Sequence, residues 1–334
     1  MASTARSCCS AESCAKAGWP RNRATTAATL AAVSVLADAA VAQAPRAAAV
    51  AADISDRYVF CMFEPVCPPS SRGLATLRGH QCDDGLVVPA VRMCVWPASR
   101  DRFISAGIWD KGMWTYTLNE RTRRRIVCNL ASSTRDRAAW IYDVGANIGS
   151  VTLPLAALGR NVLAFEAYPP NAALLNASLI ALTHRTAAGG YSRLIHAALT
   201  APGAPTVLCM REPDPSNQGS VLVSRTAAAC DDRARVRALT MDAALAEVFP
   251  TALLSQSPLP RVSALKIDVE GHEVAVLSGA GQLFNASPPR ALVIEARRKS
   301  ARWVKTFAST RGYLPTWEHT DDYAFARREI SPLL

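Results

Sequence analysis

The sequence predicts an α/β fold, doubly wound, in which a mostly parallel sheet is covered by helices on both faces. Three observations predict it. From about Trp140 onward short apolar runs alternate with helical stretches, a glycine-rich turn follows the first run, and an acidic residue, Glu166, ends the second. Such alternation is typical of βαβ units, whose parallel strands are buried by the connecting helices.

Each element follows from its own pattern. Strands are expected where short apolar runs end in a turn or a charge, at 140–144, 161–165, 194–199, a run ending near 241, 264–268 and 291–295. Helices are expected where apolar residues recur at helical spacing, at 151–158, 171–182, 242–249 and 272–284. Prolines in 202–237 indicate an inserted hairpin or loop, and 302–328 indicates a helix followed by a two-stranded antiparallel hairpin.

Composition excludes several classes of protein. The chain has 334 residues, which fits one domain plus an appendage. Its net charge of +10 comes from 32 Arg and 5 Lys scattered among 27 acidic residues, so we expect no nucleic-acid partner. A run of about 18 strongly apolar residues, as a membrane span needs, does not occur. Membrane association is therefore expected only through the N-terminal segment.

Three regions are predicted along the chain. Residues 1–52 are rich in Ala and poor in acids, which indicates a targeting, signal or disordered leader. Arg21 and Arg23 before an apolar stretch favour a secretory signal or signal anchor, whereas the Arg, Ser and Thr content also suits a plastid or mitochondrial transit peptide. Residues 53–124 form a Cys-containing extension, and residues 125–334 form the α/β domain.

The cysteines favour disulfides over metal binding. Cys61, Cys67, Cys82 and Cys94 lie in a loop-rich segment and predict a disulfide-stapled region, which requires an oxidising compartment. Zinc is the competing interpretation. It is disfavoured because the spacing contains no CxxC pair and His80 is the only nearby histidine, so no metal site is predicted. We expect three further cysteines to be isolated thiols: Cys128, Cys209 and Cys230.

The glycine-rich turn predicts a nucleoside site. Gly145 and Gly149 allow a tight turn at a helix N-terminus, where a nucleoside can approach without meeting a Cβ. Glu166 would accept hydrogen bonds from both ribose hydroxyls. A nicotinamide site would show GxGxxG, whereas this turn is GxxxG preceded by Asp143. An anion there suits the cationic S-adenosylmethionine better than a pyrophosphate.

A second acidic cluster follows the strand at 264–268. Asp268 and Glu270 are expected at the carboxyl edge of the sheet, where ligands bind in open α/β folds, although such a pair also caps helices. Lys266 lies inside the strand, and because Lys is rarely buried unpaired we predict that it pairs with a nearby carboxylate. Glu295 ends the next strand in the equivalent position.

These segments together resemble one family. Six segments, in their order and spacing, are similar to the FkbM-type methyltransferases. They are 143–149, 165–166, 175–176, 239–242, 266–273 and 293–295. The combination of DVGANIG with KIDVEGHE is specific, and the match covers roughly 141–295. The resemblance implies a Rossmann-like seven-stranded sheet of the class I methyltransferase type and S-adenosylmethionine as cofactor.

The resemblance also implies an activity and the residues that carry it. Methyl transfer to a hydroxyl is expected, with a sugar, glycan or small metabolite as the acceptor. Asp143, Gly145, Asn147 and Gly149 would form the cofactor turn and Glu166 the ribose acceptor, while Asp268 and Glu270 would face the methyl group. Asp268 or His272 would be the general base. The alternatives are a catalytically idle binding protein that keeps the fold and a nicotinamide-dependent oxidoreductase. Oligomeric state is left open.

Overall fold

The main sheet confirms the predicted fold class. The computed structural model describes residues 67–115, 117–133, 136–183, 189–211, 213–224, 234–250 and 259–328. Seven strands form one sheet, in which five consecutive strands are parallel and the last two strands of the chain make an antiparallel hairpin at one edge. In spatial order these strands are β14 (Tyr313–His319), β15 (Asp322–Arg327), β13 (Ala291–Glu295), β12 (Val262–Ile267), β5 (Trp140–Val144), β6 (Asn161–Glu166) and β7 (Ser192–His196).

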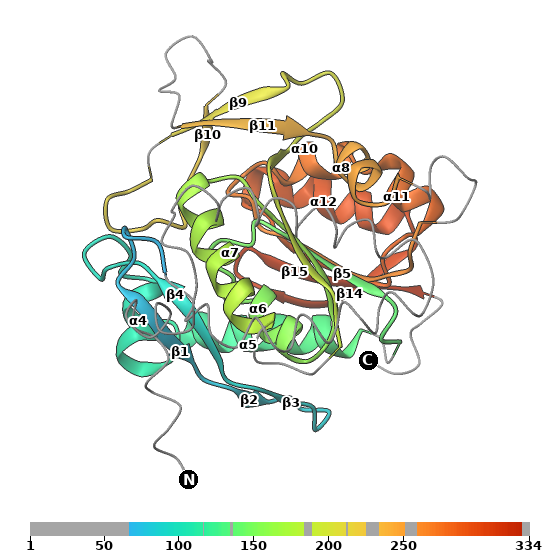
Figure 1. Cartoon of the computed structure of the whole chain (residues 1–334). Helices are drawn as coiled ribbons and strands as arrows, with labels where there is room; N and C mark the ends of the chain where they lie inside the picture. Colours follow the sequence, from blue (N-terminus) through green and yellow to red (C-terminus); the bar gives the residue numbers. More distant parts are fainter. Residues whose placement is uncertain are drawn as a thin grey trace, which may run out of the picture. The chain divides into compact units, whose positions relative to one another are not determined.

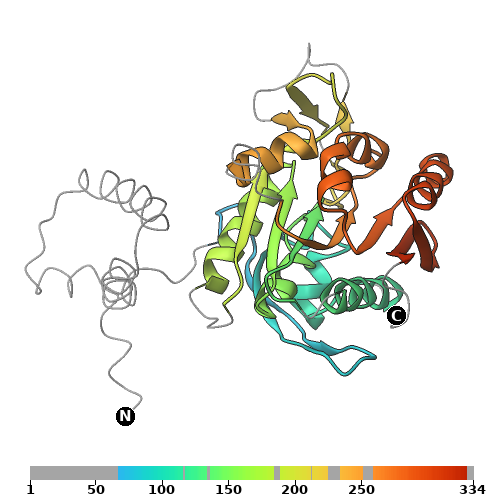
Figure 2. The ribbon, with the colours of Figure 1, turned by 90° about the vertical axis from the view of Figure 1, so that its right-hand side faces the viewer.

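Helices cover both faces of this sheet, as Figures 1 and 2 show. One face is packed by α5 (Thr117–Ser132), α6 (Thr152–Ala157) and α7 (Pro169–Thr183). The other face is packed by α8 (Met241–Val248), α10 (Glu273–Ser278), α11 (Gly281–Ala286) and α12 (Arg298–Thr310). Alternate strand residues point to opposite faces, so β12 contributes Ala264 to the first core and Leu265 to the second.

Three predicted elements differ from the structure. The run 194–199 is divided at Ala197, because β7 stays in the main sheet while β8 (Ala198–Leu199) pairs with β11 (Arg235–Leu239). The strand expected to end near 241 is β11, which lies outside the main sheet. The single helix expected at 272–284 is two short helices, α10 and α11, separated at Gly279, where an added Cβ would lie 2.2 Å from the Thr200 carbonyl oxygen.

The predicted insertion is a small sheet with its own core. β9 (Val207–Met210) pairs antiparallel with β10 (Val223–Ser224) and with β11. Its core includes Met210 and Val221, which pack with Ala198 of β8. In Figure 1 this sheet lies above the carboxyl ends of the parallel strands. The insertion is therefore placed where it can cover the site.

The segment before the main sheet packs against it. The elements are β1 (Gly73–Leu77), β2 (His80–Gln81), β3 (Val87–Val88), β4 (Val91–Val95) and α4 (Ser105–Lys111). Core residues of β1 and β4 share one cluster with α5, α6 and α7, and 67–334 forms one compact unit. Helix α5 runs through the predicted domain boundary at 124/125. Within the described residues, no helix is long and apolar enough to cross a membrane.

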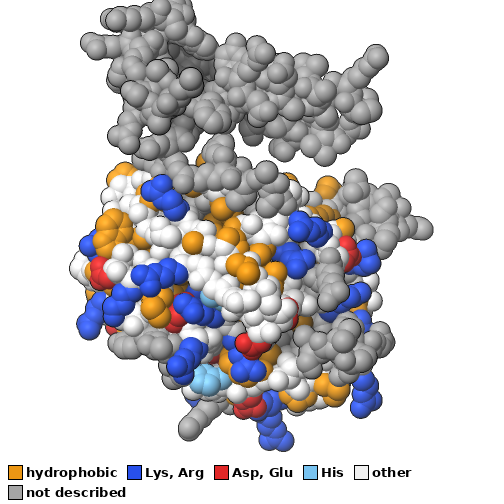
Figure 3. Space-filling view, turned by 90° about the horizontal axis from the view of Figure 1, so that it is seen from below, with side chains coloured by type: hydrophobic (Ala, Val, Ile, Leu, Met, Phe, Trp, Pro, Cys, Tyr) orange, Lys and Arg blue, Asp and Glu red, His pale blue; other side chains and the backbone are white. Residues whose placement is uncertain are grey.

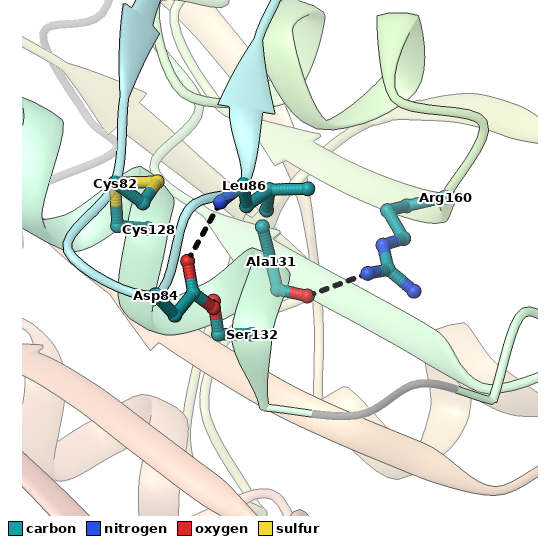
Figure 4. Close-up of a disulfide and its surroundings, with 7 residues drawn as sticks. All are labelled: Cys82, Asp84, Leu86, Cys128, Ala131, Ser132 and Arg160. Carbon is teal, nitrogen blue, oxygen red and sulfur yellow. Dashed lines mark hydrogen bonds between the residues drawn. A yellow bond between two sulfur atoms is a disulfide. The ribbon is translucent and has the colours of Figure 1, made fainter.

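Two disulfides join this segment internally and to α5. Cys67 bonds to Cys94, and Cys82 bonds to Cys128. Figure 4 shows the second bond, beside which Asp84 accepts hydrogen bonds from the Leu86 amide and the Ser132 hydroxyl. A disulfide-stapled region is thus present, but only Cys67–Cys94 joins two of the four cysteines expected to form it.

The expectation of an isolated thiol was wrong for Cys128, because α5 brings it against the β2–β3 turn. It was also wrong for Cys209, which is disulfide-bonded. Cys61 and Cys230 lie outside the described residues. A spacing argument confined to 61–94 could not include a partner on a later helix.

Candidate active site

The turns that follow β5 and β12 pack directly against each other. The Asp268 amide donates to the Val144 carbonyl oxygen at 3.0 Å, and an added Cβ at Gly145 would lie 1.7 Å from the Asp268 carbonyl oxygen. Gly145 also has a positive φ of 76°. The predicted tight turn is present, but the glycine is required by the neighbouring turn rather than by space for a ligand. Gly149 packs against Leu175 of α7 instead of lining a cavity.

Glu166 is buried at the end of β6 with its carboxylate held by two backbone amides. Asn147 N–H donates to Oε2 at 2.7 Å, and Tyr168 N–H donates to Oε1 at 2.8 Å. Burial raises the pKa of Glu166 to about 7. A carboxylate has about four acceptor sites, so each oxygen retains one for a further donor. The side chain is therefore fixed and still able to accept two hydrogen bonds.

Asp143 lies behind the turn rather than in it. Its carboxylate is fully buried, accepts a hydrogen bond from the Thr152 hydroxyl at 2.6 Å, and lies 3.0 Å from Lys266 Nζ. Lys266 Nζ also donates to the Gly145 carbonyl oxygen at 2.8 Å and lies 3.5 Å from Asp268 Oδ2. The predicted pairing of Lys266 with a carboxylate is confirmed. Asp143 thus anchors the turn through Lys266.

Charge at the end of β12 is shared among several groups. Although burial opposes it, the nearby carboxylates of Asp143 and Asp268 raise the pKa of Lys266. Burial opposes ionisation of Asp268, but Lys266, the hydrogen bond from Glu295 and the charge of Arg297 together hold its pKa below the usual range. The Asp268 carboxylate and its hydrogen bond raise the pKa of Glu295 strongly. At neutral pH Asp268 is therefore ionised and Glu295 is protonated and donates to it.

The residues after Asp268 form a left-handed turn at the mouth of the site. Glu270 and Gly271 have positive φ values of 55° and 102°. The Glu270 carboxylate pairs with the Arg297 guanidinium. Burial and the neighbouring Asp268 raise the pKa of Glu270 to about 7. His272 follows at the start of α10, where Glu273 Oε1 accepts a hydrogen bond from the Gly271 amide at 2.7 Å.

One cavity of about 290 Å³ collects most of the predicted site residues. Its walls include Gly145, Asn147, Glu166, Asp268, Glu270 and His272, whereas Asp143 and Gly149 are not among its lining residues. Apolar side chains from the start of the small sheet, Ala198 and Leu199, line the part near Glu166. The volume is close to the lower end of the range for ligand pockets. The cavity therefore joins both sequence clusters at one edge of the sheet.

Part of the cavity wall was not predicted from the sequence. Phe103, Ile104, Trp114 and Asn119 come from the segment before the main sheet, and Met210, Asn217, Gly219, Val221 and Val223 come from the insertion. Arg297 and Asp322 were also missed. Asp322 is paired in register with Glu295, and burial raises its pKa to about 7. An acid directly opposite the end of a strand is visible only once the hairpin register is known.

A buried ion pair holds Trp114 at the cavity. Glu120 is 2% exposed and accepts hydrogen bonds from Arg123 at 2.7 and 2.9 Å and from the Trp114 amide at 3.0 Å. Although burial opposes it, Arg123 holds the pKa of Glu120 below its usual value. Arg123 also donates to the Ser150 carbonyl oxygen at 3.3 Å, next to the glycine-rich turn. The ion pair thus links the two sides of the cavity.

Solved structures of low sequence identity share similarity with this chain. One is the magnesium protoporphyrin IX methyltransferase from Synechocystis PCC 6803, at 12% identity over 62% of this chain and 78% of that chain, with a TM-score of 0.34. Another is the precorrin-6y C5,15-methyltransferase from Geobacter metallireducens GS-15, at 13% identity over 70% of this chain and 100% of that chain, with a TM-score of 0.36. No curated protein matches the chain in sequence.

A family model covers the part of the chain that builds the main sheet and the site. Residues 143–323 match the model described as the methyltransferase FkbM domain. The matched range begins at the residue that anchors the glycine-rich turn and ends within the hairpin at the sheet edge. Because this match covers just over half of the sequence, the chain belongs to the FkbM methyltransferase family.

Proposed function

We propose that the chain is an S-adenosylmethionine-dependent methyltransferase that methylates a hydroxyl of a sugar, glycan or similar neutral metabolite. The observation that carries the proposal is the Glu166 carboxylate. It is buried beside the glycine-rich turn, fixed by two backbone amides, and retains two acceptor sites in the cavity wall. That is the arrangement expected for a ribose diol.

The rest of the cavity fits the same cofactor. Ala198 and Leu199 supply an apolar surface near Glu166, which suits an adenine ring. Asp268 and Glu270 line the same cavity and supply negative charge, which suits a cationic sulfonium and ammonium. A pyrophosphate would be repelled by the same carboxylates. The apolar and negatively charged side chains of the cavity therefore favour S-adenosylmethionine over a nicotinamide dinucleotide.

The acceptor side favours a neutral, hydroxylated molecule. Carboxylates of Asp268 and Glu270 accept hydrogen bonds from hydroxyls and repel phosphate or carboxylate groups. Trp114 and Phe103 add aromatic surface to the same cavity, against which the apolar face of a sugar ring can pack. Asn119 and Asn217 supply amide donors and acceptors. These contacts support a polyol rather than an anionic acceptor.

The protein's task in the reaction is alignment and proton acceptance. Bound S-adenosylmethionine supplies an activated methyl group on a sulfonium sulfur. Asp268, kept ionised by Lys266, accepts a hydrogen bond and orients the acceptor. Glu270 has a pKa of about 7, which suits a general base at neutral pH, and takes up the acceptor's proton. His272 lines the same wall and is the second candidate for that role.

We also propose that the chain matures in an oxidising compartment, most simply the secretory pathway. The disulfides Cys67–Cys94 and Cys82–Cys128 support this location, because such bonds persist in oxidising environments. Peptide mapping of the protein from its native source without reduction should recover both pairs. Recovery of free thiols at all four positions would contradict the proposed compartment.

Transfer of a labelled methyl group tests the proposed reaction. The chain is incubated with S-adenosylmethionine labelled on the methyl group and with neutral glycans, polyols and carboxylated sugars. We expect label on neutral acceptors that resists mild alkali, because ethers resist hydrolysis and methyl esters do not. Glu270→Gln should lower kcat while leaving cofactor binding intact. Alkali-labile label alone would contradict a hydroxyl acceptor, and the absence of transfer despite cofactor binding would favour the idle binding protein.

A further inference from the structure

A histidine lies against the Cys82–Cys128 disulfide, one of the two that involve the segment before the main sheet. His80 and Cys82 are two residues apart at the end of β2, so both side chains point to the same side of the hairpin. Cys128 of α5 meets them there. The sulfur atoms and the nearest ring nitrogen lie within 4.8 Å of one another. Ligand atoms around tetrahedral zinc lie about 3.8 Å apart, given Zn–S distances of about 2.3 Å.

The His80 imidazole is a polar group that the hydrogen-bond network of the described residues leaves without a well-formed bond. Both ring nitrogens are buried, and neither makes a hydrogen bond of good geometry. Buried polar side-chain atoms are normally paired, so this histidine calls for an explanation.

We propose that the reduced chain binds one Zn²⁺ through His80, Cys82 and Cys128. The metal-bound form and the Cys82–Cys128 disulfide are alternative states of one site. A dithiol reductant gives two electrons and two protons to the disulfide and becomes a disulfide itself. Zinc then displaces the two thiol protons and binds both thiolates and the imidazole, with water in the fourth position.

Charge supports this ligand set. Zn²⁺ with two thiolates and a neutral imidazole has no net charge, so the guanidinium groups of Arg123 and Arg124 do not oppose the complex. In an oxidising compartment the zinc form would precede the disulfide and would return on reduction. The sequence did not indicate this site, because Cys128 lies 46 positions after Cys82.

The second disulfide is a matched control. Cys67 and Cys94 are also bonded, but among the described residues no histidine or carboxylate joins them in a cluster of three ligands. Both pairs are therefore reduced together, and only one is expected to hold zinc. This difference can be read within a single sample.

Site-resolved alkylation tests the proposal. The full chain is reduced with a phosphine without oxygen, incubated with or without Zn²⁺, treated with N-ethylmaleimide, and mapped by peptide mass spectrometry. Zinc should protect Cys82 and Cys128 and leave Cys67 and Cys94 reactive. His80→Gln, which keeps all the cysteines, should lose most of this protection. The oxidised chain should bind no zinc at the site.

The outcomes separate the site from non-specific thiol binding. Equal protection of both cysteine pairs, or unchanged protection in His80→Gln, would overturn the proposal. Circular dichroism follows the fold in parallel. A reduced chain that keeps its fold only with zinc supports the site, whereas one that unfolds with and without zinc overturns it. A parent chain with no protection of Cys82 and Cys128 overturns it as well.

Discussion

The two halves of the cavity are built in different ways. The half around Glu166 comes mainly from one short stretch of chain, in which β5, a glycine-rich turn and β6 follow one another, and β8 adds Ala198 and Leu199. The opposite half combines residues that flank α4 on both sides, the start of α5, the insertion and the turn after β12. Local geometry therefore sets the proposed cofactor half, whereas long-range packing sets the proposed acceptor half.

Polar links hold the acceptor half in place. Asn171 of α7 accepts a hydrogen bond from Trp96 Nε1 at 2.8 Å and donates to the Gln218 carbonyl oxygen at 2.9 Å. It thereby ties the N-terminal segment to the insertion across the helix. Glu120 of α5 accepts a hydrogen bond from the Trp114 amide and so holds Trp114 against that helix. Because these groups are buried, each link is costly to break on one side only. The contrast between the halves can be tested by breaking each in turn.

The largest effect is expected for Gly145→Ala. Its Cβ would lie 1.7 Å from the Asp268 carbonyl oxygen, and neither backbone segment can move without disturbing the sheet. We expect a loss of about 4 kcal/mol or more in the free energy of unfolding, measured with urea. Gly312→Ala is the matched control, because that glycine also has positive φ but nothing within 4 Å, so about 1–2 kcal/mol is expected. Similar losses would contradict the packing argument.

The next effect concerns the ion pair of the acceptor half. Arg123→Met should lower the free energy of unfolding by about 3–5 kcal/mol, because it leaves the buried Glu120 carboxylate with a weaker partner. Arg124 is 38% exposed, so Arg124→Met should cost less than about 1 kcal/mol. The double variant Glu120→Gln/Arg123→Met should recover part of the loss. A mild effect of Arg123→Met would show that the ion pair does not hold this wall.

The third effect distinguishes the two halves of the cavity by their contribution to cofactor affinity. Glu166→Ala should weaken S-adenosylhomocysteine binding by about 100-fold, because hydrogen bonds to a charged group contribute about 1.5–3 kcal/mol each. Trp114→Ala should leave this affinity unchanged and lower methyl transfer to acceptors. Both are measured by calorimetry and by label transfer. Loss of cofactor affinity in Trp114→Ala would show that the halves are not independent.

The smallest effect is a dependence of cofactor affinity on pH. In the free protein the pKa of Glu166 is about 7, and its ionised form accepts stronger hydrogen bonds from the ribose hydroxyls than its protonated form does. Affinity should therefore fall as pH drops below about 7, by up to about tenfold per pH unit, and level off above it. Calorimetry in buffers of different ionisation enthalpy should detect proton release. Glu166→Gln should remove this dependence and Glu270→Gln should keep it.

Much of the sheet could be predicted because its signals are local. The apolar runs of β5, β6, β12 and β13 and the glycine-rich turn follow from neighbouring residues. The division of the run at Ala197 could not be predicted, because β8 leaves the sheet to pair with a strand some forty residues away. The two helices after β12 also escaped prediction, since Gly279 is needed for its contact with Thr200.

The residues of the candidate site that end strands could be predicted from the sequence, and those that depend on long-range packing could not. Glu166 and Asp268 end strands whose order the sequence indicates, so their meeting at one sheet edge was expected. The burial of Asp143 beneath the turn was not, because it depends on where Lys266 reaches. Trp114 reaches the cavity wall through tertiary packing, and Asp322 lies opposite Glu295 through hairpin register, and local sequence patterns carry neither relation.

The net charge of the chain does not predict where its basic residues lie. On the face shown in Figure 3, Lys and Arg side chains are spread among uncharged atoms rather than gathered in one patch. Several basic residues are used within the fold, as Arg123 is inside the acceptor half and Lys266 is beneath the glycine-rich turn. A positive net charge alone therefore says little about a partner, and the binding of S-adenosylhomocysteine is the more direct question.

The central claim is that the Glu166 half of the cavity binds the nucleoside of S-adenosylmethionine. Calorimetric titration of the folded chain with S-adenosylhomocysteine, and separately with NADH, tests it most directly. We predict saturable binding of S-adenosylhomocysteine at one site per chain and no binding of NADH. Binding of NADH alone, or of neither ligand by a chain with intact circular dichroism, would contradict the claim.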